Sequence, residues 1–168
     1  MFKVGDTVSY PMHGVGRVES IEKREVRGVE NTYYVLCFRT DGLKVLIPVG
    51  RAAEAGLREV ISAREAEEVI AFIADCGADE SFANWNRRYR HNLDRLKAND
   101  IRSIARVVKS LALRSADRGL SSGEKNMLKN ARTYLSDELA TATGRSEAEM
   151  EALLDELLAS CAGHPVLE

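Results

Sequence analysis

The chain has 168 residues, of which 45% are hydrophobic and 30% are charged. This composition is typical of a soluble globular protein and excludes a disordered tail. No apolar run approaches the about 20 residues that span a bilayer, and Met1–Asp6 lacks the apolar core of a signal peptide. We therefore expect a cytoplasmic protein that does not associate with membranes.

The formal net charge of −2 conceals a strong segregation of charge along the chain. Residues 1–81 carry 10 Lys/Arg and 14 Asp/Glu, residues 82–132 carry 13 and 4, and residues 133–168 carry 1 and 8. The net charges are therefore −4, +9 and −7. The basic central block favours binding to a polyanion, since a binding surface responds to the local potential. The alternative is a solvated helix face that neutralises the acidic C-terminal end.

The three cysteines, Cys37, Cys76 and Cys161, are far apart and lack C-x-x-C spacing. Their odd number and spacing indicate neither a disulfide framework nor a zinc site. We expect all three to be reduced and mostly buried as small apolar residues. No metal or other cofactor is expected.

Residues 1–61 predict β-strands separated by glycine turns. Segments rich in Val, Ile, Tyr and Phe are Arg17–Val26, Thr32–Arg39 and Lys44–Pro48. Asp41-Gly42 predicts a tight hairpin, because such a turn needs the positive φ that glycine adopts without steric cost. With a short strand near Val8 and a closing strand from Leu57 to Ile61, the layout predicts a five-stranded SH3-like or Tudor-like barrel. Pro48 removes a backbone donor, which suits an edge strand open to a protein partner.

The periodicity becomes helical at residue 62, which divides the chain into domains of residues 1–61 and 62–168. Three capping boxes predict helix starts, because a serine hydroxyl accepts from a free backbone N–H and a glutamate three residues on reaches back to the serine amide. They are Ser62-x-x-Glu65, Ser121-x-x-Glu124 and Ser146-x-x-Glu149. Two more helices are expected, from Phe82 to Lys97 and from a cap at Asp100 to Gly119. The fold class is thus a β domain followed by a compact five-helix domain.

In the helix after Asp100, apolar spacing predicts an inward face. It consists of Ile101, Ile104, Ala105, Val108, Leu111 and Ala112. Arg102, Arg106 and Lys109 are expected to point outward.

Near its start the basic block carries the only tryptophan of the chain, Trp85, followed closely by Arg87, Arg88 and Arg90. An exposed aromatic ring among cations is suited to nucleic acid, because the cations bind phosphates and the ring stacks on or wedges between bases. The alternative is that Trp85 belongs to the core, since it lies at helical spacing with other apolar residues.

The chain resembles the CarD/CdnL family over nearly its whole length. In the N-terminal half the similar segments are Phe2–Val8, Tyr10-Pro11, Gly14–Gly16, Val45–Val49 and Gly56–Arg58. In the helical half they are Asn84–Arg90 and Asp117–Leu128. Two extended motifs at the expected separation are far more specific than a short glycine pattern.

This resemblance implies a bacterial transcription factor that binds RNA polymerase and does not read a DNA sequence. It implies that the Tudor-like domain docks on the polymerase β subunit and that the helical domain meets promoter DNA at the upstream edge of the melting bubble. The same N-terminal module occurs in the transcription-repair coupling factor, which is a large helicase. No phosphate-binding loop or motor domain is evident in this sequence.

The resemblance also implies roles for individual residues. Arg24, Val35, Leu46 and Pro48 fall on positions implicated in the polymerase contact. Leu46 stands where actinobacterial members have arginine, which indicates the CdnL-like branch and a more apolar contact. Trp85 matches a tryptophan that acts in this family as a wedge in the DNA minor groove. Phosphate contacts are expected from Arg87, Arg88, Arg90 and Lys125.

Two other classes of function remain open from the sequence. A protein-only adaptor would bind RNA polymerase without touching DNA and would have a buried Trp85. An enzyme is not expected, because His13, His91 and His164 lie in unrelated surroundings: a glycine loop, the basic cluster and the C-terminal tail. A polymerase-docked adaptor is most simply a monomer.

Overall fold

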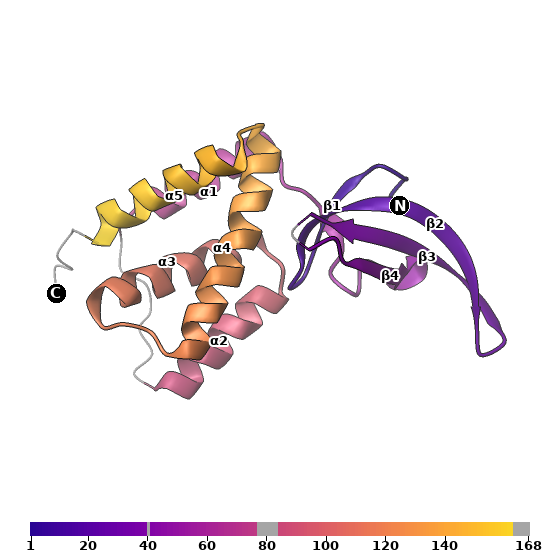
Figure 1. The fold of residues 1–168 in the computed structure, drawn as a ribbon, viewed down its shortest axis with the longest axis horizontal. Coiled ribbons are helices and arrows are strands. Elements are labelled where there is room, and N and C mark those ends of the chain that lie inside the picture. The colour runs from indigo at the N-terminus through magenta and orange to yellow at the C-terminus, as the bar shows by residue number, and fades with distance from the viewer. Residues whose placement is uncertain (40, 77–83, 163–168) are drawn as a thin grey trace. The chain divides into compact units, whose positions relative to one another are not determined.

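The computed structural model describes residues 1–39, 41–76 and 84–162. It divides the chain into two compact units, Met1–Val60 and Ile61–Glu168. Figure 1 shows strands in the first unit and helices in the second. The expected order of a β half followed by an α half is confirmed.

The first unit is a five-stranded antiparallel sheet in the order β4-β3-β2-β1-β5. Its strands are β1 (Thr7–Tyr10), β2 (Gly14–Val26), β3 (Val29–Phe38), β4 (Lys44–Pro48) and β5 (Arg58–Glu59), with a short 3-10 helix η1 (Val49–Arg51) before β5. Among the described residues the outer strands β4 and β5 do not pair with each other. The sheet is therefore not closed by hydrogen bonds, and a barrel is not confirmed.

Short connections join the three longest adjacent strands. Arg27 and Gly28, with φ of 54° and 78°, form the two-residue connection between β2 and β3, and positive φ at both positions matches the right-handed strand twist. The expected turn at Asp41-Gly42 is confirmed. Gly42 has φ of 65°, and the Leu43 N–H donates to Asp41 Oδ1 at 2.9 Å.

Alternation along β3 decides which residues enter the core. Tyr34, Leu36 and Phe38 are buried at 2% exposure or less. They pack with Val8, Val18, Ile47, Ala52 and Leu57. The odd-numbered residues of β3 therefore lie on the opposite face of the sheet.

The described residues of the second unit form five helices, as expected. They are α1 (Ala63–Ala74), α2 (Trp85–Lys97), α3 (Ile101–Asp117), α4 (Ser122–Thr143) and α5 (Glu147–Ala162). The boxes at Ser62 and Ser121 and the cap at Asp100 are formed as predicted, and Ser146 and Glu149 exchange the equivalent bonds. Helix α2 begins at Trp85, and the expected start at Phe82 lies outside the described residues.

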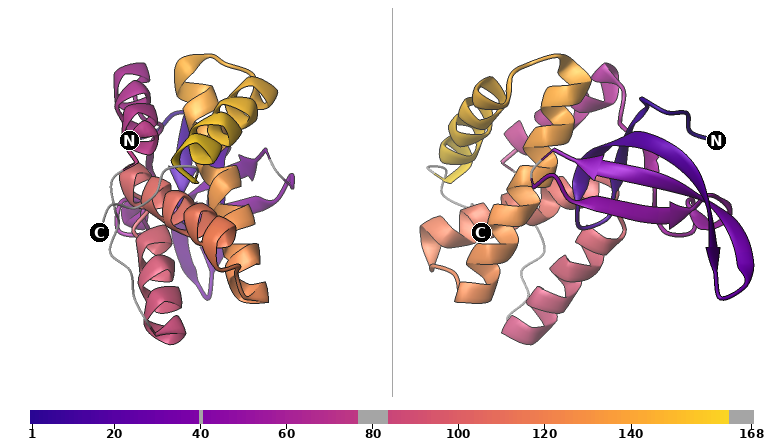
Figure 2. Two further views of the ribbon diagram at one scale, coloured as in Figure 1. Left: turned by 90° about the vertical axis from the view of Figure 1, so that its left-hand side faces the viewer. Right: turned by 45° about the vertical axis from the view of Figure 1, so that its right-hand side comes forward.

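Helix α4 packs against α1, α3 and α5 (Figure 2). The side chains between the helices form one apolar core. Fully buried core residues include Val69, Ile73, Leu111, Leu135 and Leu154. No helix in the described part of the chain is long and apolar enough to cross a membrane.

The expectation of an outward Lys109 is wrong, because this side chain is only 5% exposed. Its ammonium donates to the carbonyl oxygens of Phe72, at 3.2 Å, and Asp75, at the C-terminal end of α1. It also lies 5.0 Å from the centroid of the Phe72 ring. A cation is stabilised near the carbonyl end of a helix. Spacing along α3 could not reveal this partner on another helix.

The expectation of three reduced cysteines is also wrong. A disulfide joins Cys76, just after α1, to Cys161 near the end of α5, with Cα atoms 5.0 Å apart. Cys37 is free and half-buried on β3. The pair is 85 residues apart in the sequence and is brought together by the packing of α1 against α5.

Candidate functional site

Trp85 is the first residue of α2 and is 44% exposed. The Asn84 side chain caps the helix by accepting from the N–H groups of Asn86, at 2.9 Å, and Arg87, at 3.4 Å. A capped start fixes the backbone from which the indole projects. The alternative that Trp85 is a core residue is therefore wrong.

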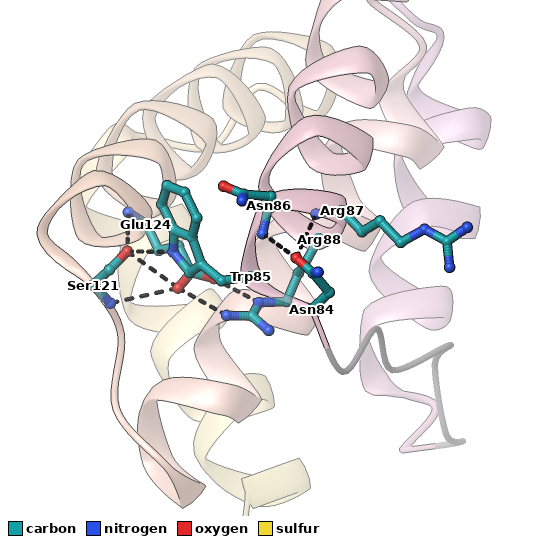
Figure 3. A network of polar contacts seen from close by, with 7 residues as sticks. All are labelled: Asn84, Trp85, Asn86, Arg87, Arg88, Ser121 and Glu124. Carbon is teal, nitrogen blue, oxygen red and sulfur yellow. Dashed lines mark hydrogen bonds and ion pairs between the residues drawn. The ribbon is translucent and has the colours of Figure 1, made fainter.

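Two contacts orient the indole on the protein surface. Its ring stacks on Tyr89 one turn later, with centroids 5.2 Å apart and planes inclined by 21°. Its Nε1–H donates to Ser121 Oγ at 2.9 Å (Figure 3). Gly123 lies beneath Tyr89, where an added Cβ would approach Tyr89 Cε2 to 3.4 Å. The first turns of α2 and α4 thus hold the ring from two sides.

A buried ion pair ties these two helix starts together. Arg88 Nε donates to Glu124 Oε2 at 2.8 Å, and Arg88 Nη2 donates to Glu124 Oε1 at 3.1 Å. The two side chains are only 8% and 2% exposed. The hydrogen bond from Arg88 lowers the pKa of Glu124, against the effect of burial, which raises it. Arg88 was expected to contact phosphate, but its guanidinium is directed into the protein.

The other cations expected to contact DNA are exposed. Arg87 and Arg90 belong to α2, and Lys125 lies one turn beyond Ser121 on α4. In Figure 3 the indole turns toward Ser121, whereas Arg87 projects from the other side of α2. An open depression on that side is lined by Asn84, Asn86, Arg87, Arg90, His91 and Asp94. Exposed cations therefore lie on both of the helices whose first turns hold the indole.

From the sequence, Ser121 and Glu124 were expected only to start a helix. In the structure the same two residues contact Trp85 and Arg88, and Tyr89 supports the indole. The available signal was the box itself, whose tertiary partners cannot be inferred from local spacing.

The four residues expected to contact polymerase share one face of the sheet. Val35 pairs with Leu46, the neighbouring Tyr33 pairs with Pro48, and Asn31 pairs with Arg24. Residues paired directly across strands point to the same face, and alternate residues of one strand share a face. This face, opposite the core, includes buried Val35 and 39%-exposed Leu46.

Arg24 is held on this face by Glu22, a neighbour on β2 that was not among the expected contact residues. Its guanidinium donates to Glu22 Oε2 from Nη2, at 2.8 Å, and from Nε, at 3.1 Å. These bonds lower the pKa of Glu22. The pair is exposed, so its main effect is to orient Arg24.

Comparison with known proteins agrees with both units. Residues 2–61 match the model of the CarD-like/TRCF RID domain, and residues 68–155 match the model of the CarD C-terminal domain. The chain belongs to the CarD family. It is also 31% identical over 152 residues to YdeB of Bacillus subtilis (strain 168), an alignment that covers 90% of this chain and 99% of the relative.

Membership of the CarD family indicates a role in the regulation of transcription through interaction with RNA polymerase. The resemblance noted in the sequence is therefore confirmed at the level of the family. The polymerase-facing and DNA-facing residues remain predictions, for which the geometry above supplies the physical basis.

Proposed function

We propose that this CarD-family protein docks on the β subunit of RNA polymerase through its N-terminal unit and stabilises the promoter open complex. In this proposal Trp85 wedges into the minor groove at the upstream fork of the bubble. The observation that carries the proposal is the exposure of Trp85, at 44%, on a ring held by Ser121 and Tyr89. A large aromatic side chain held at the surface has no role in the core.

The wedge acts by differential binding. A ring inserted at the fork fits only distorted, partly melted DNA, so it favours the open state over the closed one. Unstacking costs a few kcal/mol per base step. A wedge that contributes about 1.4 kcal/mol would change the opening equilibrium about tenfold.

Phosphate contacts then come from the exposed cations. Arg87 and Arg90 lie on the side of α2 away from the indole, and Lys125 lies on α4. Cations on both of the helices that hold the wedge suit contacts with the two strands that border the groove. Their contribution is independent of sequence and decreases with salt. Arg88 acts in this proposal by holding Glu124.

The N-terminal unit supplies the attachment. Arg24, Val35, Leu46 and Pro48 form the docking face, and the SH3-like or Tudor-like barrel expected from the sequence belongs to this part of the proposal. Leu46 presents apolar surface where an arginine would present charge. Docking as a monomer, without a cofactor, places the helical unit near the promoter at high effective concentration, so weak DNA affinity suffices.

The test of the wedge is the lifetime of the open complex on a weak promoter with the cognate polymerase. The wild type should lengthen this lifetime, and Trp85→Ala should remove the effect while folding and binding polymerase equally. If both proteins act alike, the DNA-wedge proposal fails, and the protein-only adaptor bound to polymerase takes its place.

The docking face is tested separately by Leu46→Glu. A carboxylate in an apolar contact should weaken binding to polymerase by about tenfold or more, since its desolvation is costly. Leu43→Glu, at another exposed leucine in the turn before β4, is the matched control. Equal loss in both variants would contradict the assignment of this face.

A further inference from the structure

The Trp85 indole has one hydrogen-bonding group, its Nε1–H. That group is engaged by Ser121 Oγ at 2.9 Å (Figure 3). The exposed part of the ring is therefore apolar. A wedge presented in this way offers surface for stacking but no donor for a base.

The hydroxyl of Ser121 is fixed in its hydrogen-bonding direction. It donates to Glu124 Oε1 at 3.2 Å and accepts from the Glu124 N–H at 3.2 Å. A serine hydroxyl has one donor and two acceptor sites. With the donor directed to a carboxylate, which only accepts when ionised, the remaining lone pair is directed to the indole.

The carboxylate of Glu124 is fixed in turn by Arg88, which lies one turn after Trp85 on the same helix. The two bonds of this pair measure 2.8 and 3.1 Å, and both side chains are buried. A bidentate pair adds geometric specificity to its electrostatic energy. The chain of contacts therefore runs from α2 to α4 and returns to α2 at the indole.

We propose that Ser121 is a positioning residue that orients the Trp85 wedge and withdraws its only donor from the minor groove. The groove presents adenine N3 and thymine O2 as acceptors, and guanine adds an N2 donor. A free indole N–H would distinguish these patterns. An engaged one leaves the wedge responsive to unstacking and groove shape. This inference rests on the proposed function of Trp85.

The first measurement is made on the full-length protein alone. The single tryptophan gives one indole N–H signal in a proton–nitrogen NMR spectrum. Ser121→Ala should move this signal and speed its exchange with solvent several-fold, and Ser121→Thr, which keeps the hydroxyl, should restore slow exchange. Ser62→Ala removes the equivalent hydroxyl from the box of α1 and should leave the signal in place.

The second measurement is open-complex lifetime with polymerase, on promoters that differ only at the base pair beside the wedge. Ser121→Ala should shorten the lifetime several-fold, by more than Ser62→Ala does, and should increase the difference between A·T and G·C promoters. An unchanged indole signal, or equal shortening by the two alanine variants, would overturn the inference.

Failure of the proposed function is distinguishable from failure of this inference. If Trp85→Ala leaves the lifetime unchanged, the wedge itself is wrong. If Trp85→Ala shortens the lifetime but Ser121→Ala does not alter promoter discrimination, the wedge stands and the role of Ser121 in specificity is wrong.

Discussion

The box that starts α1 and the box that starts α4 share one sequence pattern but differ in their tertiary surroundings. Ser62 and Glu65 are exposed, and their bonds of 2.8 to 3.1 Å close the first turn of α1. The Glu124 side chain is 2% exposed and also binds Arg88, while Ser121 also binds Trp85. The same local motif therefore starts one helix and, in the other, fixes a surface tryptophan.

Removal of the glutamate carboxylate should give the largest difference in stability between the two boxes. Glu124→Ala leaves the buried Arg88 without this partner, and such losses destabilise by about 3 to 5 kcal/mol. Urea unfolding followed by the fluorescence of the single tryptophan measures the change. Glu65→Ala, in the exposed box, is the control and should cost far less. Equal losses would show that burial of the Arg88–Glu124 pair contributes little.

At its other end α1 differs from α4, since it is attached by a disulfide between Cys76 and Cys161. Opening it with dithiothreitol should lower the free energy of unfolding by about 2 to 4 kcal/mol, because the cross-link restricts the unfolded chain. Cys161→Ala should remove the response to reductant, and Cys37→Ala, at the free cysteine, should retain it. A wild type indifferent to reductant contradicts the cross-link.

Removal of the serine hydroxyl should give a smaller difference in stability between the two boxes. Ser62→Ala and Ser121→Ala each lose a cap worth about 1 kcal/mol. Ser121→Ala also loses the bond from the indole, for which about a further 1 kcal/mol is expected. Urea unfolding of both variants in parallel measures the difference. Indistinguishable stabilities would mean that the indole contact adds no net stability.

The smallest expected effect is on the loss of stability at acid pH, which is the acid limb of the curve of stability against pH. Arg88 holds the pKa of Glu124 below its ordinary value of 4.5. The resulting stabilisation is fully present above the ordinary value and is lost as the pH falls through the lower folded-state pKa. Glu124→Gln should therefore flatten the acid limb. Glu54→Gln, at an exposed carboxylate, controls for net charge, and the same flattening in both would contradict the assignment.

The local elements were largely predictable from the sequence. The serine boxes, the Asp100 cap and the Asp41-Gly42 turn are short-range arrangements, in which each partner lies within a few residues of the other. The β-then-α order also followed from the change of periodicity at residue 62. Closure of the sheet into a barrel could not be judged in this way, because it depends on pairing between distant strands.

The candidate site was predicted in part. The exposure of Trp85 agrees with its expected use on a surface, but Arg88 was grouped with its neighbours by charge alone. Helical spacing separates the two: Arg88 faces the core side of α2, and Arg87 faces outward. The sequence contained this difference, but the partner that makes burial of an arginine tolerable, Glu124, lies 36 residues away.

The sequence by itself determined where helices and turns begin, because those choices depend on hydrogen bonds between near neighbours and on the period of apolar residues. Tertiary structure decided which charges and thiols meet. Three such contacts join separate helices. Lys109 of α3 binds carbonyl groups at the end of α1, Cys76 is bonded to Cys161, and Glu124 pairs with Arg88. Burial of a charge is favourable only with a partner in place. Packing supplies that partner, and with it the fixed position of Trp85.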